Sequence, residues 1–331
     1  MSSDTLSDVL RAVRLTGAVF IDVNVTVPWA TFAPKSHHLI PLIMPDAQHL
    51  ISYHLVTEGE CYAVQKGHEP IRMQAGDLIV FPHGDHHSLT SEPSLRAPAS
   101  FDVSELDLTS QRPWKIVGGG TGSDRIKLVC GFLGCDVRPF NPLLAALPDQ
   151  IHCSGKNPDC NARLSHFYQL AVMESHGQRI GGESILAKLS ELLFIELVRM
   201  YLESLPKEQT GWLAGLRDRH VGQALSLMHA HPARDWTLEA LSGEVGLSRS
   251  ALSDRFTEFV GVPPMQYLTK WRMQIASGLL TQGQSNIAKI AVDVGYESEA
   301  AFSRAFKKVV GMPPAAWRKS RQNGAGNSLN P

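Results

Sequence analysis

Short apolar runs separated by turn-forming residues make up the chain from about Gly17 to Cys130. HLISYHLVTEG, ECYAVQ, LIVFPHGD and RIKLVCGFLG are examples. Apolar runs of this length, bounded by Gly, Pro and Asp, are typical of β-strands. A succession of many short strands predicts a sandwich or a small barrel.

The pattern changes at about Asn141, after which apolar residues recur at helical spacing. The longest predicted helix runs from Glu183 to Glu203 and carries apolar residues around much of its circumference. Such a helix can lie against the sheet-rich part or pair with its copy in a second subunit, and the sequence leaves these alternatives equal. The segment Pro206–Trp212 is typical of a linker, and helical spacing resumes after it.

These patterns divide the chain into five parts. We expect a sheet-rich domain over residues 1–140, a helical segment over 141–205, a linker over 206–218, a helical domain over 219–320 and a disordered tail over 321–331. The predicted fold class is a multidomain α+β protein.

The net charge of −1, from 31 Lys and Arg against 32 Asp and Glu, conceals two unlike halves. The segment from Trp212 to Pro331 holds 14 basic and 9 acidic residues, a net charge of +5, which leaves 17 basic and 23 acidic residues, or −6, before it. The last third is therefore the part suited to a polyanionic partner such as nucleic acid.

No apolar run reaches the eighteen or so residues that a membrane span needs, so we expect no membrane partner. The first twenty residues mix Asp and Arg with apolar positions and lack the pattern of a secretory signal, which predicts a cytoplasmic location. In that compartment the five cysteines are expected to be reduced thiols rather than a disulfide framework.

The basic third contains an internal repeat. The stretch GLSRSALSDRFTEFVGVPP (246–264) recurs as GYESEAAFSRAFKKVVGMPP (295–314), at a spacing of 50 residues through most of its length. Each copy, over about 237–259 and 286–309, predicts a helix, a turn at Gly246 or Gly295, and a second helix capped by Ser248 or Ser298. A helix from Met265 to Gly283 connects the copies and can hold both second helices on one face, about 34 Å apart.

The second helix of each copy has an outward face of small and polar side chains, as a helix that meets DNA base edges requires. The candidate DNA-binding residues are Ser248, Arg249, Ser250, Ser253 and Asp254 in the first copy and Ser298, Glu299, Ala300, Ser303, Arg304 and Lys307 in the second.

This arrangement, from about Arg219 to Lys319 and including Arg272 and the closing GMPPAAWR, resembles the DNA-binding domain of the AraC/XylS family of bacterial transcription regulators. The resemblance implies two helix-turn-helix units that bind double-stranded promoter DNA, with RNA polymerase and a second copy of the chain as partners. Glu299 stands where Arg249 stands in the first copy. A carboxylate accepts a hydrogen bond from cytosine but repels phosphate, so the second helix has the weaker case for base contact.

The segment AGDLIVFPHGDHHSL (75–89) resembles the second motif of cupin barrels, and His87 takes the position of a metal-ligand histidine. Ser52 occupies the position where the first cupin motif would supply a Glu. His54 projects to the same strand face as Ser52 and is the candidate partner of His87, with His83 and His49 as further candidates. The sequence therefore allows a metal ion in the barrel or, as the favoured alternative, histidines that only hydrogen-bond.

Cys130 and Cys135 are candidates for a thiol pair that oxidises, against the alternative that they are small buried apolar residues. His152, Cys153 and Cys160 follow at spacings that are a weak signal for zinc. The predicted function is a sequence-specific transcription regulator whose N-terminal barrel responds to an unknown small-molecule effector or a redox signal. The alternative is a cupin-type metal-dependent enzyme with a helical appendage.

Overall fold

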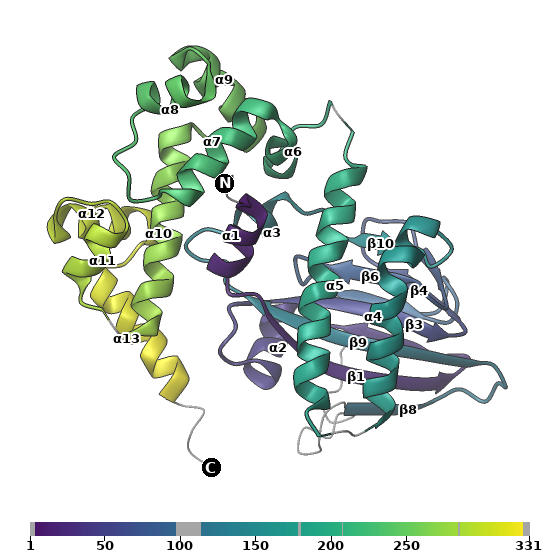
Figure 1. Ribbon diagram of the computed structural model, residues 1–331. Helices are drawn as coiled ribbons and strands as arrows, with labels where there is room; N and C mark the ends of the chain where they lie inside the picture. The colour runs from purple at the N-terminus through teal and green to yellow at the C-terminus, as the bar shows by residue number, and fades with distance from the viewer. Residues whose placement is uncertain (1–3, 97–113, 178–179, 207, 284, 327–331) are drawn as a thin grey trace. The chain divides into compact units, whose positions relative to one another are not determined.

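The computed structural model describes residues 4–96, 114–177, 180–206, 208–283 and 285–326 (Figure 1). Contacts between residues divide the chain into two compact units. The sheet domain comprises Leu15–Cys135 and Leu147–Glu203, and the helical domain comprises Met1–Arg14, Asp136–Ala146 and Ser204–Pro331. The helical domain thus includes Met1–Arg14, which the sequence prediction assigned to the sheet-rich domain. It also includes Asp136–Ala146, which spans the predicted boundary between the sheet-rich domain and the helical segment.

The sheet domain holds two sheets. The six-stranded sheet has the order β10 (Ile151–Cys153), β6 (Leu78–Phe81), β3 (His49–Glu58), β9 (Arg125–Cys135), β1 (Thr16–Thr26) and β8 (Trp114–Gly119). The four-stranded sheet has the order β2 (Ala30–Ala33), β7 (His87–Thr90), β4 (Glu60–Val64) and β5 (Ile71–Gln74). All described pairs are antiparallel except β1 with β8.

One apolar core lies between the two sheets. Val23 and Phe132 come from the larger sheet, while Ala63, Met73 and Leu89 come from the smaller one, and all five are buried in the same cluster. Among the described strands no hydrogen-bonded ladder joins the two sheets. Of the two predicted arrangements, the sandwich therefore describes the domain better than a closed barrel does.

Three helices accompany the sheets. Helix α2 (Ser36–Ile43) packs on β3. Helices α4 (Pro158–Gly177) and α5 (Gly182–Ser204) lie side by side along the larger sheet (Figure 1). Tyr53 on β3 and Ser190 on α5 share a buried hydrogen bond of 2.8 Å between their hydroxyl oxygens, which fixes α5 against the sheet.

The helical domain is built on α10 (Pro264–Gln282), which runs between two helix pairs (Figure 1). The first pair is α8 (Leu238–Val245) with α9 (Arg249–Val260), and the second is α11 (Ile287–Asp293) with α12 (Glu299–Val310). Ile290, Phe302 and Phe306 pack with Met273 and Leu280 of α10 in one buried cluster. The multidomain α+β class predicted from the sequence is confirmed.

Two segments differ from the sequence prediction. Helix α6 (Trp212–Arg217) occupies much of the expected linker, because Trp212 and Leu213 are buried and the Trp212 indole donates a 2.9 Å hydrogen bond to the Tyr267 hydroxyl. It leads into α7 (Arg219–Ala230). Helix α13 (Pro314–Gly326) continues into the expected disordered tail, whose residues 327–331 lie outside the described part.

One buried side chain, Gln274, binds the two stretches that precede residue 204 in the helical domain. These stretches are Met1–Arg14, which contains helix α1 (Thr5–Ala12), and Asp136–Ala146, which contains α3 (Pro142–Ala146). The Gln274 amide, on α10, donates to the Ala12 carbonyl at 2.9 Å and accepts from the Phe140 N–H at 3.0 Å. Gln274 is 1% exposed, so these bonds satisfy a polar group that would otherwise be costly to bury. No helix in the described part of the chain is long and apolar enough to cross a membrane.

Candidate nucleic-acid interface and ligand cavity

The turn of each helix pair has the predicted chemistry. Gly246 and Gly295, at the ends of α8 and α11, adopt φ values of 72° and 82°, a region that glycine enters without steric cost. Ser248 and Ser298 then cap α9 and α12, since their hydroxyl oxygens accept from the N–H groups of Ala251 and Ala301 at 3.2 Å. The local sequence thus fixes where each second helix begins.

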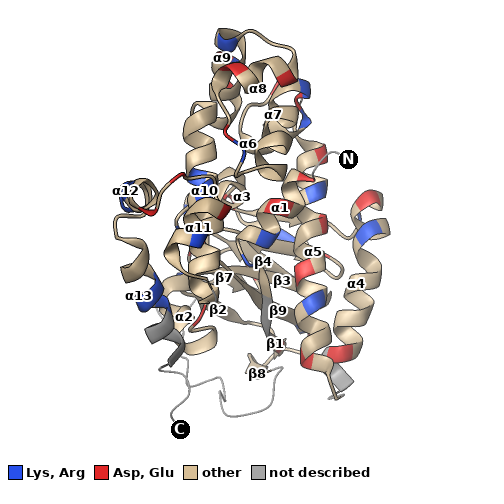
Figure 2. Ribbon diagram, turned by 60° about the vertical axis from the view of Figure 1, so that its left-hand side comes forward, with Lys and Arg blue, Asp and Glu red and all other residues tan. Residues whose placement is uncertain are grey.

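The candidate DNA-binding residues all lie on the surface of these two helices or at their caps. Ser253 and Ser303 are half-buried, and the other nine are exposed. The opposite faces are anchored by Leu252 and Phe256 on α9 and by Phe302 and Phe306 on α12, all fully buried. Figure 2 shows basic residues on α9 and α13. Each helix is therefore held from behind and presents a polar face outward.

The basic side chains on these faces are uncommitted. Within the described residues, Arg249, Arg304 and Lys307 form no ion pair. Arg255, on the same helix as Arg249, forms an ion pair with Asp218. Arg272 donates to the carbonyls of Pro232 and Arg234 at 2.7 and 2.8 Å, so it holds a loop of the domain.

Glu299 has a local role that explains its place at the start of α12. It lies in the first turn of this helix, where a negative charge interacts favourably with the helix dipole. A base contact is not needed to account for it.

A cavity of about 50 Å³ lies in the sheet domain. A single water needs only about 10–15 Å³, so the cavity has room for more than one. Its described lining is almost wholly apolar, with aromatic rings from Trp29, Phe32 and Phe132, and with His54 and Cys130 among the few polar groups. Such a cavity suits a small apolar molecule.

The structure brings together two of the four candidate histidines of the sheet domain. The Nε2 atoms of His54 and His87 are 2.7 Å apart, and the two side chains are 6% and 2% exposed. Burial lowers the pKa of His87 to about 4 and the pKa of His54 well below its usual range. Both imidazoles are therefore neutral at pH 7.

The other candidates lie elsewhere. His83 Nε2 bonds to the Leu147 carbonyl at 2.9 Å, and His49 Nε2 bonds to the Pro82 carbonyl at 2.7 Å. Burial also lowers the pKa of His49. Their ring nitrogens are thus engaged with main-chain oxygens outside the His54–His87 pair.

These residues do not fit a mononuclear metal site of the cupin kind. The pair supplies two ligands, whereas a metal bound in a protein usually takes three or four. Within the described residues, no group of three or more His, Cys, Asp or Glu side chains is placed to hold a metal ion. The hydrogen-bonded alternative is the one that the geometry supports.

The candidate thiols are not brought together. Cys130 and Cys135 are both buried and outside any disulfide, and they lie five positions apart on β9. An odd offset along a strand places side chains on opposite faces, about 17 Å apart here. Burial also raises the pKa of the Cys130 thiol, which keeps it protonated and unreactive.

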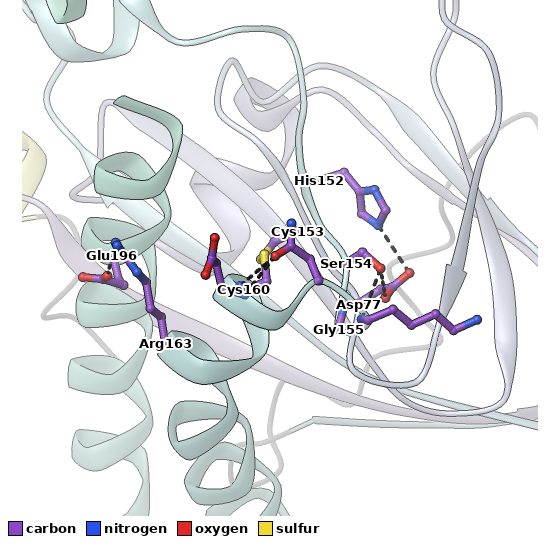
Figure 3. Close-up of a disulfide and its surroundings, with 11 residues drawn as sticks. Asp77, His152, Cys153, Ser154, Gly155, Cys160, Arg163 and Glu196 are labelled. Atoms are coloured by element: carbon purple, nitrogen blue, oxygen red, sulfur yellow. Dashed lines mark hydrogen bonds and ion pairs between the residues drawn. A yellow bond between two sulfur atoms is a disulfide. The ribbon is translucent and has the colours of Figure 1, made fainter. Parts of the chain in front are cut away.

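A different pair is oxidised, so the expectation of reduced cysteines is wrong for these two residues. Cys153, at the end of β10, forms a disulfide with Cys160, in the first turn of α4, and their Cα atoms are 6.1 Å apart (Figure 3). The turn between strand and helix brings these positions within disulfide range, which residue spacing alone did not reveal.

A buried carboxylate, Asp77, holds the chain beside this disulfide (Figure 3). It accepts hydrogen bonds from the Gly155 N–H at 2.8 Å, the Ser154 hydroxyl at 3.2 Å and His152 Nε2 at 3.3 Å. Asp77 and Gln274 are two buried polar residues that the sequence prediction missed. The available signal was a polar residue next to apolar ones: Gln274 lies between Met273 and Ile275, and Asp77 directly precedes the apolar run of β6.

Comparisons with known proteins agree with both sequence resemblances. A cupin family model matches residues 4–203, and a helix-turn-helix domain model matches residues 241–320. A putative AraC-like transcription regulator of Streptomyces lividans is 34% identical over 83% of this chain and 88% of its own length. The transcriptional regulator AlkR of Acinetobacter baylyi is 28% identical over 96% and 99%, respectively.

A solved structure that spans most of the chain is more distant. The crystal structure of unsaturated fatty acid bound ToxT from Vibrio cholerae is 14% identical, covers 92% of this chain and 95% of that chain, and has a TM-score of 0.32.

Proposed function

The chain belongs to the AraC-like family of transcription regulators, and on that premise we propose that α9 and α12 bind one promoter site while the cavity of the sheet domain takes a small-molecule effector. The protein is a DNA-binding regulator with a cupin domain before its helix-turn-helix domain. The proposal concerns which residues bind DNA and what the cavity does.

One observation carries the proposal. Helices α9 and α12 are each anchored by buried residues on one face, and the opposite faces expose basic side chains that form no ion pair within the described residues. On the first, Arg249 is the residue best suited to a bidentate contact with guanine, because its guanidinium is exposed and has no partner within the described residues. On the second, Arg304 and Lys307 are suited to phosphate, and Glu299 weakens the case for base contact. Ser248, Ser250, Ser253, Asp254, Ser298, Ala300 and Ser303 complete the proposed interface.

Selection of genomic fragments by the purified full-length protein tests the function. We expect enrichment of fragments that share one asymmetric motif with two parts about one helical turn apart. Recovery of fragments without a shared motif would contradict the proposal. The genes beside enriched sites also indicate which compound the cavity binds.

A homodimer is proposed from the outer faces of α4 and α5. Leu170 and Met173 on α4 and Ile185 and Leu192 on α5 are 44–51% exposed, which is unusual for four large apolar side chains on adjacent helices. Sedimentation of the parent and of Leu192→Glu checks this. We expect a dimer that the added charge dissociates, whereas a monomeric parent would rule the dimer out.

The path from the cavity to the DNA is proposed to follow β1 and β9. Ile21 on β1 and Cys130 on β9 line the cavity. The stretch with Ala12 directly precedes β1 and the stretch with Phe140 directly follows β9, and Gln274 forms hydrogen bonds with both stretches. An effector that displaces the two strands would alter these bonds and, through α10, the spacing of α9 and α12. Exchange of the Phe140 amide hydrogen, measured with and without effector, checks this, and an unchanged rate would contradict it.

The remaining partners follow from the family. We propose that the regulator acts in the cytoplasm, where promoter DNA and RNA polymerase are present. Co-purification with RNA polymerase on a selected fragment tests the second partner, and occupancy of the fragment by the regulator alone would contradict it.

A further inference from the structure

The disulfide between Cys153 and Cys160 closes a turn that other bonds also hold. On the strand side of this turn, Asp77 accepts a hydrogen bond from the Gly155 N–H at 2.8 Å (Figure 3). On the helix side, the Asn157 side chain accepts from the Cys160 N–H at 3.4 Å. Neither bond involves a sulfur atom, so both can persist when the disulfide is broken and keep the two cysteines within disulfide range.

The loop between the two cysteines offers a way to the buried sulfur atoms. The side chains of Cys153 and Cys160 are only 2% and 5% exposed, whereas residues 156–159 between them are all exposed. Segments with few buried contacts open locally without unfolding the rest of a domain. Opening of this one loop therefore gives a small thiol access to the disulfide, while the core between the two sheets stays closed.

The other three cysteines are poorly suited to such chemistry. Cys61, Cys130 and Cys135 are buried and outside any disulfide. Burial raises the pKa of the Cys61 thiol to about 12 and also raises the pKa of Cys130, and a protonated thiol does not exchange. Cys160 instead lies in the first turn of α4, where the helix dipole favours a thiolate and so a good leaving group.

The disulfide is a covalent link from β10 to a helix with few other strong attachments. In the described part of α4, Leu164 and Ala171 are the buried apolar residues besides Cys160. Arg163 forms an ion pair with Glu196 on α5 at 3.1 Å, but the arginine side chain is 36% exposed (Figure 3). Exposed ion pairs contribute little to stability. The position of α4 therefore depends strongly on the disulfide.

We propose that Cys153 and Cys160 form a reversible redox site, reduced by small thiols such as glutathione, and that its reduction loosens α4. Two thiols of the reductant are oxidised to one disulfide, while the Cys153–Cys160 bond takes up two electrons and two protons and becomes two thiols. The inference rests on the proposed function of a cytoplasmic regulator, because a disulfide in that compartment is usually a sensor rather than a staple. Since Leu170 and Met173 of α4 belong to the proposed dimer face, reduction should weaken the dimer.

Alkylation of the full-length protein in glutathione buffers tests the site. The native protein is equilibrated at increasing ratios of reduced to oxidised glutathione, quenched with acid, denatured and alkylated, and the labels are counted by mass spectrometry. We expect three labels under oxidising conditions and five with reduced glutathione in large excess, with the circular dichroism of a folded protein throughout. A count that does not change with the ratio, or that rises only as the protein unfolds, would overturn the proposal.

Sedimentation of the same samples tests the effect on α4. We expect reduction to raise the dissociation constant of the dimer about tenfold, within the usual range for coupling between two sites. Cys160→Ser should match the reduced parent at every ratio, while Cys61→Ala, which removes a buried thiol outside the disulfide, should respond as the parent does. Equal dissociation constants for the oxidised and reduced parent, or a monomer in both states, would contradict the role of α4.

The fragment selection described above separates the two levels of failure. A protein that selects a DNA motif but whose disulfide does not respond to glutathione retains its proposed function and lacks the redox site. A protein that selects no motif fails at the earlier level, whatever glutathione does to Cys153 and Cys160.

Discussion

The helical and sheet domains place their functional groups in opposite ways. In the helical domain the proposed contacts, such as Arg249 and Lys307, are exposed on helices whose other faces are buried. In the sheet domain the candidate residue His54 is buried and forms a hydrogen bond with His87 from a different strand. A surface that binds DNA is built by local sequence, whereas a cavity that binds a small molecule is built by packing between distant segments.

This difference has an energetic consequence. Changing an exposed side chain of the helical domain should weaken DNA binding and leave folding intact. Changing a group inside either domain should cost stability, because its partners lose a contact that water cannot replace.

The largest expected effect is on the pH dependence of stability in the helical domain, which, like the sheet domain, buries a neutral imidazole. Burial lowers the pKa of His229 to about 3, and the ring stacks on Trp271 with centroids 3.9 Å apart. Unfolded histidine titrates near 6.5, so the unfolded state binds the proton first and stability falls as the pH drops below about 6.5. Between pH 7 and pH 4 we expect a loss of roughly 3 kcal/mol.

Urea unfolding followed by tryptophan fluorescence measures this loss. The His229→Phe variant should lack most of the helical domain's pH dependence over the same range. A variant with the parent's full dependence would show that other groups cause it.

The next effect is confined to the sheet domain, because all five cysteines lie in it. Cys160→Ser removes the disulfide to Cys153 and should lower the free energy of unfolding by about 2–3 kcal/mol, as expected for a short closed loop. Denaturation without reductant measures it. Reductant should weaken the parent to the level of the variant and leave the variant unchanged, and a variant as stable as the oxidised parent would refute the stabilising role.

A smaller effect is expected on DNA binding by an exposed side chain. Arg249→Ala should reduce discrimination between specific and random DNA by about 1–3 kcal/mol, because a bidentate guanine contact is lost. Fluorescence anisotropy with both DNAs measures it, and the unfolding free energy should stay within about 0.5 kcal/mol of the parent. Equal weakening on both DNAs would identify Arg249 as a phosphate contact.

The smallest effect is electrostatic. Lys307→Ala should weaken binding to all sequences alike and reduce the salt slope of the binding constant by about one. Titrations at several salt concentrations give the slope. Lys188→Ala, at an exposed position of α5, is the matched control, and the same slope in both variants would argue against a phosphate contact at Lys307.

The local features of this protein could be predicted from its sequence. The positions of α9 and α12 follow from Gly246, Ser248, Gly295 and Ser298, whose conformations and hydrogen bonds involve residues at most a few positions away. His54 and His87 were also found, because the alternation of a strand and a known motif predict which face each occupies. Their mutual hydrogen bond supports the alternative that the sequence favoured, histidines that only hydrogen-bond.

The rest depended on contacts that no local pattern encodes. Trp212 lies in a stretch with Pro, Gly and charged residues typical of a linker, and only its contact with Tyr267, 55 positions away, makes it part of a core. The disulfide was missed for a related reason. Cys130 and Cys135 were predicted as a pair from their closeness in sequence, but both lie on β9, where an extended strand keeps their side chains apart. The turn after β10 instead brings Cys153 to Cys160.

The composite make-up of the helical domain limits how this protein can be divided. An expression fragment that begins at residue 204 contains both helix-turn-helix units but lacks α1 and α3. In that fragment the Gln274 amide loses both of its main-chain partners, Ala12 and Phe140, and the apolar face that Phe140 covers on Tyr267 is exposed. Exchange of sensor domains between related regulators must therefore transfer three stretches of chain together, because a single cut between the domains divides a folded unit.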